Sequence, residues 1–162
     1  MASSLTRRRF NSWLGAAAAG TGGLSAGVVS TPVAAATELP LFDAHIHYSH
    51  DAWEVVPPPQ AISILRQAGL RGAFVSSSND EGTQLLIAEA TRVGLPDLIV
   101  PELRPYRLRS DVSTWVRDEA ITRYMEQRLA KYRYVGVGEF HLYGEDTELA
   151  VPRRLVALAR EH

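Results

Sequence analysis

Two histidines that stand two residues apart are the side chains of this chain best suited to chemistry. His45 and His47 belong to the segment DAHIH at positions 43–47, which follows the apolar run LPLF at positions 39–42. Because side chains of a β-strand alternate between its two faces, we expect Asp43 to share one face with both histidines. The opposite face would then hold Phe42, Ala44 and Ile46. Two imidazoles on one face at the end of a strand predict half of a metal site, since neutral imidazole suits zinc and related cations.

A second segment of this kind occurs later in the chain. Positions 135–141 read VGVGEFH, and strand alternation places Glu139 and His141 on one face. A carboxylate that faces two imidazoles can complete or bridge a metal site, so we predict Glu139 as the third ligand. The alternative for Glu139 is a structural ion pair. His141 could be a ligand, a support for a ligand or a substrate contact, and we treat it as a candidate substrate-binding residue.

A run of arginines could hold an anionic substrate. Positions 102–109 read ELRPYRLR, and Glu102 and Arg104 share a face that we expect to point into the mouth of the fold. Arg104, Arg107 and Arg109 could bind a carboxylate or a phosphate, because the guanidinium fork matches both. For Arg107 and Arg109 we favour the alternative, a solvated loop with one internal Glu–Arg pair. Arg104 is therefore the predicted substrate-binding residue of this run.

The elements that must position these residues alternate between short apolar runs and amphipathic patterns. We expect strands over residues 39–47, 72–77, 97–103 and 134–142, with helices over 60–68, 81–93 and 111–132 and a fourth helix that has Pro152 in its first turn. Repeated strand–helix units predict a parallel sheet with right-handed crossovers.

The number of these units suggests an incomplete barrel. Four units follow one another, whereas a closed (β/α)₈ barrel needs eight units and about 250 residues. The sequence also stops inside a helical pattern at His162. We therefore predict an α/β fold in which residues 37–162 form the first four βα units of a TIM barrel. The alternative is a complete four-stranded α/β domain, and open sheet edges could in either case allow self-association.

Residues 1–36 have the features of a removable export signal. TRRRF at positions 6–10 carries an arginine pair followed by Phe, a weakly apolar run covers positions 14–29, and AAA at positions 34–36 supplies the small residues that a signal peptidase needs. The segment resembles a twin-arginine export signal. We therefore expect the twin-arginine export machinery as a partner and a periplasmic or secreted location. The alternative is a retained membrane anchor, which the five glycines in the apolar run disfavour.

Composition excludes several other chemistries. Residues 1–36 hold three of the 17 basic residues and none of the 18 acidic ones, so the remainder has a formal net charge of −4. Binding to nucleic acid or anionic membranes requires clustered cations, so we expect neither partner, and no membrane span follows the signal. The absence of cysteine excludes thiolate ligands and disulfides. No glycine-rich phosphate loop follows a strand, and the serines at 76–78 lack the elbow motif of serine hydrolases.

The DAHIH segment, the Gly138-Glu139 pair and the strand–helix periodicity together resemble the amidohydrolase superfamily over residues 39–162, and within it the amidohydrolase-related and TatD-like branches. Members are metal-dependent barrel hydrolases. The resemblance implies that His45, His47 and Glu139 bind a divalent metal, with zinc first and manganese or iron as alternatives. It also implies metal-assisted hydrolysis of a small-molecule substrate. Members carry further metal-site and catalytic residues on strands 5, 6 and 8, so we expect this chain alone to be inactive and assign no catalytic acid or base.

Two other functions stay open. Phosphoesterases of the polymerase-and-histidinol-phosphatase family also begin with His-x-His, but they usually place an Asp-His pair shortly after the second strand. This chain has SNDE at positions 78–81 in that place, which makes the match poorer. A non-catalytic exported binding module could also use the same fold. Some amidohydrolase-superfamily members are decarboxylating lyases, and the predicted ligands alone do not distinguish these from hydrolases.

Overall fold

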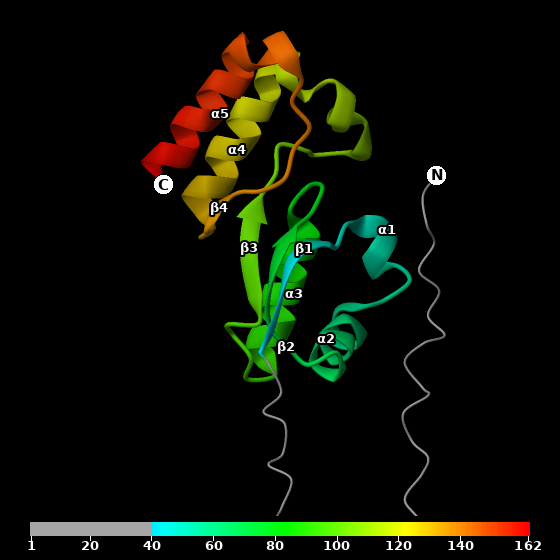
Figure 1. Cartoon of the computed structure of the whole chain (residues 1–162). Helices are drawn as coiled ribbons and strands as arrows, with labels where there is room; N and C mark the ends of the chain where they lie inside the picture. The colour runs from blue at the N-terminus through cyan, green and yellow to red at the C-terminus, as the bar shows by residue number, and fades with distance from the viewer. Residues whose placement is uncertain (1–39) are drawn as a thin grey trace, which may run out of the picture. The chain divides into compact units, whose positions relative to one another are not determined.

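Four parallel strands carry the residues singled out in the sequence. The computed structural model describes residues 40–162, so the predicted export signal at residues 1–36 lies outside the described residues. Strands β1 (Leu41–His47), β2 (Leu70–Ser76), β3 (Ile99–Leu103) and β4 (Gly136–Val137) pair in the order of the chain, as Figure 1 shows. The predicted α/β class with a parallel sheet is confirmed.

Helices connect successive strands. α1 (His50–Trp53) and α2 (Pro58–Gln67) lie between β1 and β2, α3 (Glu81–Arg92) lies between β2 and β3, α4 (Glu119–Lys131) precedes β4, and α5 (Ala150–Glu161) follows it. Three 3₁₀ turns accompany them: η1 (Arg109–Ser113), η2 (Trp115–Arg117) and η3 (Gly144–Glu148). Within residues 40–162, none of the helices has both the length and the apolar character needed to cross a membrane.

Local sequence signals explain where several helices begin and end. α2 begins at Pro58, because proline fits the first turn, where its missing N–H would have no partner. Gly69 and Gly94 follow α2 and α3 with φ of +76° and +79°, a left-handed conformation that glycine adopts without strain. α4 begins after Asp118, whose side chain accepts the backbone N–H of Ala120 at 2.9 Å. These caps set the direction in which each helix returns to the sheet.

Two apolar clusters hold the helices against the sheet. The first joins β2 to α2 and α3, and its most deeply buried members are Ile62, Ala73, Val75, Leu86 and Ala90. The second joins β3 to α4 and α5, and its most deeply buried members are Leu103, Tyr106, Trp115, Ile121 and Met125. Burial of one large apolar side chain contributes about 1.5–3 kcal/mol. These clusters therefore fix the strands at whose ends the candidate site lies.

Strand β1 contains a β-bulge that the sequence pattern does not reveal. In the pairing with β2, Asp43 lies opposite Ala73 and Ile46 lies opposite Val75, so three steps along β1 match two along β2. Within this irregular stretch, Asp43 Oδ1 accepts the backbone N–H of His45 at 3.0 Å. A bulge of this kind adds one residue and shifts the alternation of the side chains that follow.

The bulge corrects one prediction about β1. Phe42 and Ile46 do not share a face: the Phe42 ring packs edge-on against Phe74, with ring centroids 4.9 Å apart, whereas Ile46 packs against the first apolar cluster. Phe74 stands between Ala73 and Val75, which both belong to that cluster, so it points to the opposite face. The expected apolar face of β1 is therefore divided between the two sides of the sheet.

Three predicted elements differ from the structure. The helix expected over 111–132 begins only at Glu119, because the chain first forms η1 and η2. The strand expected over 134–142 is reduced to β4, since glycine at 136 and 138 weakens strand structure. Between the strand expected to end at residue 47 and the helix expected to begin at residue 60, the chain forms the additional short helix α1. The other predicted boundaries move by at most two residues.

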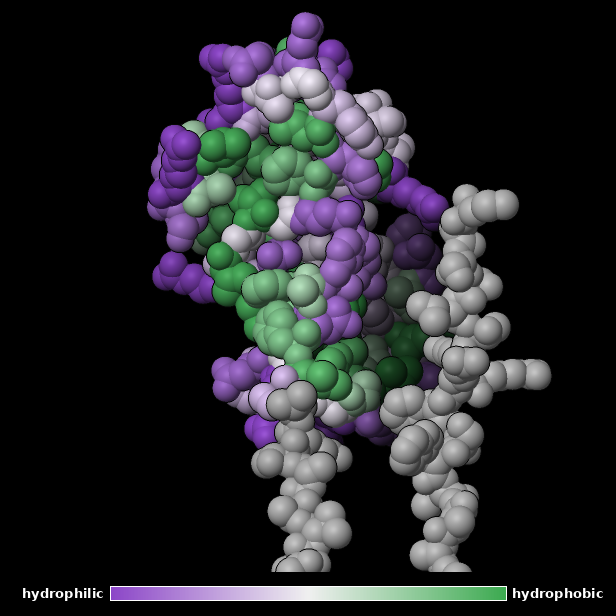
Figure 2. Space-filling view, in the orientation of Figure 1, coloured by the Kyte–Doolittle hydropathy of each residue, from purple (hydrophilic) through white to green (hydrophobic). Residues whose placement is uncertain are grey.

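Part of the apolar surface stays exposed. Large apolar side chains with about half or more of their surface exposed include Leu41, Phe42, Val135 and Tyr143. Figure 2 shows green hydrophobic surface beside a purple hydrophilic band on the face in view. Within residues 40–162, β1 and β4 are the edge strands of the sheet. Self-association through these edges stays a prediction.

Candidate metal centre

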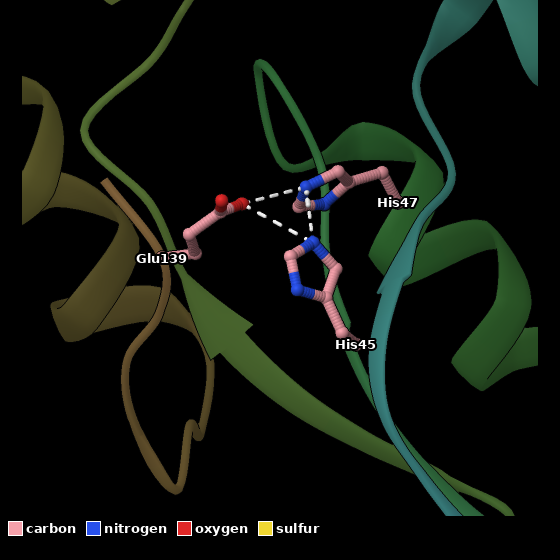
Figure 3. A group of neighbouring side chains, drawn as sticks. All are labelled: His45, His47 and Glu139. Atoms are coloured by element: carbon pink, nitrogen blue, oxygen red, sulfur yellow. Dashed lines mark hydrogen bonds and ion pairs between the residues drawn. The ribbon is translucent and has the colours of Figure 1, made fainter. Parts of the chain in front are cut away.

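Three potential ligand atoms converge where β1 and β4 end. His45 and His47 stand at the end of β1, and Glu139 follows β4 by two residues. The Nε2 atoms of the histidines are 2.9 Å apart, and Glu139 Oε2 lies 2.7 Å from His47 Nε2 and 3.3 Å from His45 Nε2. Figure 3 shows the three side chains pointing toward one another. The group could hold a metal ion, and it consists of the three residues that the sequence predicted.

The end of β2 determines which nitrogen of His47 faces the other ligands. His47 Nδ1 lies 3.0 Å from the backbone carbonyl oxygen of Ser76 and 3.2 Å from the Ser76 hydroxyl. Because a carbonyl oxygen only accepts hydrogen bonds, Nδ1 carries a proton and the neutral ring presents the lone pair of Nε2. A hydrogen bond from the distal nitrogen is the usual companion of a metal-binding histidine.

The convergence of three atoms is of a kind that a cation can satisfy. A lone pair on His47 Nε2 and a carboxylate oxygen 2.7 Å away repel each other unless positive charge lies between them. A proton could supply that charge in an imidazolium–carboxylate pair. However, one hydrogen bond joins two atoms, and here His45 Nε2 approaches both of the others. A cation can contact all three atoms at once.

The surroundings of Glu139 favour its ionised form. Partial burial raises the pKa of this carboxyl, but the hydrogen bond with His47 and the charges of His47, His45 and Arg104 outweigh that effect, so the pKa lies below its ordinary value. The side chain remains 42% exposed, so water or a ligand can reach it. An ionised carboxylate is the form that binds a cation.

Arg104 is a buried cation beside the candidate ligands. Its side chain is 7% exposed, and Nη2 lies 3.7 Å from Glu139 Oε2. Nη1 is nearly equidistant from Nδ1 and Nε2 of His47, at 3.1 and 3.2 Å. The in-plane directions of these two nitrogens diverge, so Nη1 lies over the ring and not along either direction. The guanidinium also lies 4.4 Å from the centroid of the Tyr106 ring. Two aromatic rings therefore hold Arg104 next to the ligands.

His141 does not join the ligand group. Its Nδ1 lies 3.2 Å from the Tyr106 hydroxyl, and its backbone N–H donates to the same hydroxyl at 2.8 Å. The Trp115 indole N–H donates to the His141 carbonyl at 2.9 Å. Glu139 and His141 were expected to share one face of a strand. Because β4 ends at Val137, before both residues, strand alternation does not relate their side chains. Tyr106 connects His141 to Arg104, and a role of His141 in substrate binding stays a prediction.

The other two arginines of the run have different surroundings. Arg107 forms ion pairs with Asp111 at 3.1 Å and Asp118 at 2.5 Å, which hold the turn before α4 together. Arg109 is exposed and lines a pocket beside His47. Arg107 is thus paired with two aspartates and not with the expected glutamate, whereas Arg109 is exposed as expected but lies close to the site.

A close contact between β3 and the residue before Glu139 helps to position this ligand. The Gly138 N–H donates to the Leu103 carbonyl at 2.8 Å. A Cβ atom at Gly138 would lie 2.6 Å from Glu102 Cβ, nearer than real Cβ contacts come. Burial raises the pKa of Glu102, and the charge of His45 partly offsets this effect. Glu102 thus lies between β4 and the histidines without belonging to the ligand group.

Sequence reasoning missed three residues that support the site. Ser76 orients His47 through its backbone carbonyl, and a backbone carbonyl leaves no trace in a sequence. Tyr106 contacts both Arg104 and His141, but its aromatic ring is equally typical of an ordinary core residue. Gly138 did leave a signal, because a glycine inside a strand pattern often marks a close backbone approach.

Comparison with known proteins adds no relative. No protein-family model matches the chain, and neither a curated protein nor a solved structure matches it. The resemblance to the amidohydrolase superfamily therefore stays a prediction from motifs, and function must be argued from the site itself.

Proposed function

We propose that residues 40–162 are the metal-binding part of a zinc-dependent hydrolase of the amidohydrolase type, built as the first four βα units of a (β/α)₈ barrel. The observation that carries this proposal is the convergence of His45, His47 and Glu139 at the carboxyl ends of parallel strands. Active sites of (β/α)₈ barrels lie at that end of the strands.

The order and curvature of the sheet support a barrel over a doubly wound fold. The order β1-β2-β3-β4 contains no reversal, whereas doubly wound sheets reverse at the binding crevice. In a flat sheet, three strand spacings would separate β1 from β4 by about 14 Å. His47 and Glu139 nevertheless come within 2.7 Å of each other across β2 and β3. This contact favours a sheet that curls around the site.

The ligand atoms are of the type and spacing that zinc requires. Tetrahedral zinc lies about 2.0–2.2 Å from nitrogen and oxygen ligands, which places those ligands about 3.3–3.5 Å apart. The three atoms here are 2.7–3.3 Å apart, so outward shifts of less than about 1 Å would seat the ion. Three protein ligands leave a fourth position for water or substrate. Manganese and iron accept the same ligands and are the alternatives.

The residues around the ligands have separate tasks in the proposed reaction. A zinc ion bound here would lower the pKa of a water molecule and polarise the scissile carbonyl or phosphoryl group. Ser76 keeps Nε2 of His47 turned toward the other ligands. Glu139 supplies negative charge, and Arg104 is close enough to bind an oxygen of the substrate. The expected substrate is a small ester, amide, lactone or phosphodiester.

Metal content tests the ligand assignment. After incubation with zinc and dialysis into metal-free buffer, the wild type should retain an equimolar amount of zinc. The double variant His45→Ala/His47→Ala and the single variant Glu139→Gln should lose it. His162→Ala is the matched control, because His162 is an exposed histidine outside the group. Equal zinc in the wild type and the double variant would refute the ligand set.

Hydrolysis is tested with the zinc-loaded full-length protein on a panel of esters, amides, lactones and phosphodiesters. We expect turnover that Glu139→Gln and chelators abolish. Turnover confined to phosphoesters would favour the polymerase-and-histidinol-phosphatase alternative. Retained zinc without turnover of any member of the panel would favour a non-catalytic exported binding module.

A further inference from the structure

We propose that the substrate of this site carries an oxyanion, a carboxylate or a phosphate group, which Arg104 and Arg109 bind in the pocket beside His47. This subsite deepens the proposed function and depends on it, because it places the rest of the substrate next to the candidate zinc ligands. No partner other than a small anionic molecule is required.

The pocket has the size and the lining that a small anion needs. It encloses about 380 Å³ beside His47, within the range of small-molecule sites. Its polar lining consists mainly of side chains that attract anions or donate hydrogen bonds to them: Ser49, His50, Ser78, Arg104 and Arg109. Asp51 is the acidic residue of this lining. Because His47 belongs to both the pocket and the ligand group, an anion bound here would lie beside the metal centre.

Arg104 has hydrogen-bonding capacity that the protein does not use. A guanidinium carries five N–H donors. Nη1 lies over the His47 ring, Nη2 reaches Glu139 only at 3.7 Å, and the buried Nε has no partner among the described residues. A cationic donor that is buried without an acceptor costs free energy. The rings of His47 and Tyr106 nevertheless hold this side chain in place, as expected for a group prepared to receive an acceptor from a ligand.

Arg109 differs from its neighbour Arg107 in the charge available to a ligand. Arg107 is neutralised by Asp111 and Asp118. Arg109 has no ion-pair partner within residues 40–162, and its side chain lines the pocket. A cation bound at Glu139 would add positive charge near Arg104, and an anion in the pocket would offset the resulting repulsion. Charge balance therefore favours an anionic substrate in the metal-loaded site.

Calorimetry with two simple anions tests the subsite. Inorganic phosphate and succinate are titrated into the wild type, and succinamide serves as the uncharged match for succinate. The protein is first kept metal-free, because both anions also bind zinc. We expect at least one anion to bind, and the stronger one identifies the phosphate or carboxylate class. Succinamide should bind at least about tenfold more weakly, because charged hydrogen bonds are stronger than neutral ones.

Substitutions assign the binding to the two arginines. Arg104→Gln and Arg109→Gln should each weaken anion binding by about tenfold or more. Arg104→Lys should restore part of the loss, since it keeps the charge but not the planar fork. Arg160→Gln removes the same charge from an exposed position on α5 and should leave binding unchanged. Because Arg109 is exposed, its variant keeps the test valid if Arg104→Gln does not fold.

Two outcomes overturn the subsite: no binding of either anion by the wild type, or equal affinity in the wild type and both glutamine variants. Zinc retention, measured on separate zinc-loaded and dialysed portions of the same proteins, distinguishes failure of the subsite from failure of the proposed function. Retained zinc with arginine-independent anion binding would refute the subsite alone. Anion binding that depends on Arg104 in a protein that takes up no zinc would refute the hydrolase and keep the pocket as an anion-binding site.

Discussion

The close approach of Gly138 to β3 makes one methyl group a test of how Glu139 is positioned. In Gly138→Ala, the new Cβ would lie 2.6 Å from Glu102 Cβ and 2.9 Å from Glu102 Oε2. Carbon atoms prefer separations of about 3.5–4.0 Å, so the overlap with Glu102 Cβ is about 1 Å. The carboxylate can rotate away, but Glu102 Cβ is fixed to the backbone of β3. The hydrogen bond from Gly138 to Leu103 must therefore lengthen or break.

The expected cost follows from this overlap. We expect Gly138→Ala to lower the free energy of unfolding by about 1–3 kcal/mol, the usual cost of overpacking. The backbone of Glu139 must move with that of its neighbour. Because the interactions that orient a ligand typically contribute tenfold or more to metal affinity, zinc affinity should fall by about tenfold or more.

Gly136→Ala is the matched control, because a Cβ at Gly136 would meet nothing within 4 Å. Urea denaturation measures the stability of both variants, and competition with a chromophoric chelator measures their zinc affinity. Equal stability and equal zinc affinity in the two variants would refute the steric argument. Lower stability with unchanged zinc affinity would refute the link between Gly138 and Glu139.

Three further predictions concern other parts of the chain. Burial raises the pKa of Asp111, but hydrogen bonds from Arg107 and from nearby backbone N–H groups outweigh this effect, so the pKa lies below its ordinary value of 3.8. The ionised Asp111 therefore stabilises the fold above pH 3.8, and this stabilisation is lost as the pH falls through the lowered pKa. The stability difference between wild type and Asp111→Asn in urea should accordingly shrink below pH 3.8; a constant difference would contradict this. Asp80→Asn leaves the partly buried Arg128 without its carboxylate and should lower the free energy of unfolding, measured by thermal denaturation, by about 3 kcal/mol. A change within experimental error would show that this ion pair is dispensable. Lysine in place of the three arginines within residues 6–10 should block export of a reporter fused to residues 1–36; unchanged export would exclude the twin-arginine route.

The strands that carry the candidate ligands could be predicted from short-range sequence patterns. The spacing of His45 and His47 predicted that their side chains meet, and Glu139 lies with them because parallel strands end at the same edge of a sheet. The strand–helix periodicity likewise predicted a parallel sheet of alternating strand and helix units. The strand patterns themselves depend on residues close in sequence, whereas the contact between His47 and Glu139, 92 positions apart, follows from the parallel arrangement of the strands that those patterns predict.

The remaining features depend on tertiary contacts that have no periodic signal. In the bulge of β1 the His45 N–H donates a hydrogen bond to the Asp43 carboxylate, and nothing in the segment distinguishes it from a regular strand. The place of His141 depends on a hydroxyl from Tyr106, on another element. The pocket forms because Arg109 and the loop after β1 approach each other in three dimensions. Such contacts become visible only when the fold is known.

The separation of His47 and Glu139 along the chain, 92 positions, connects the proposed metal to folding. A cation that bridges them would cross-link β1 to the segment after β4. The unfolded chain does not bring these ligands together, so the ion would bind only the folded chain and its binding free energy would add to the stability of the fold. Uptake of the ion and docking of β4 would then be one cooperative event. The resistance of the fold to denaturation would accordingly rise with the supply of the metal.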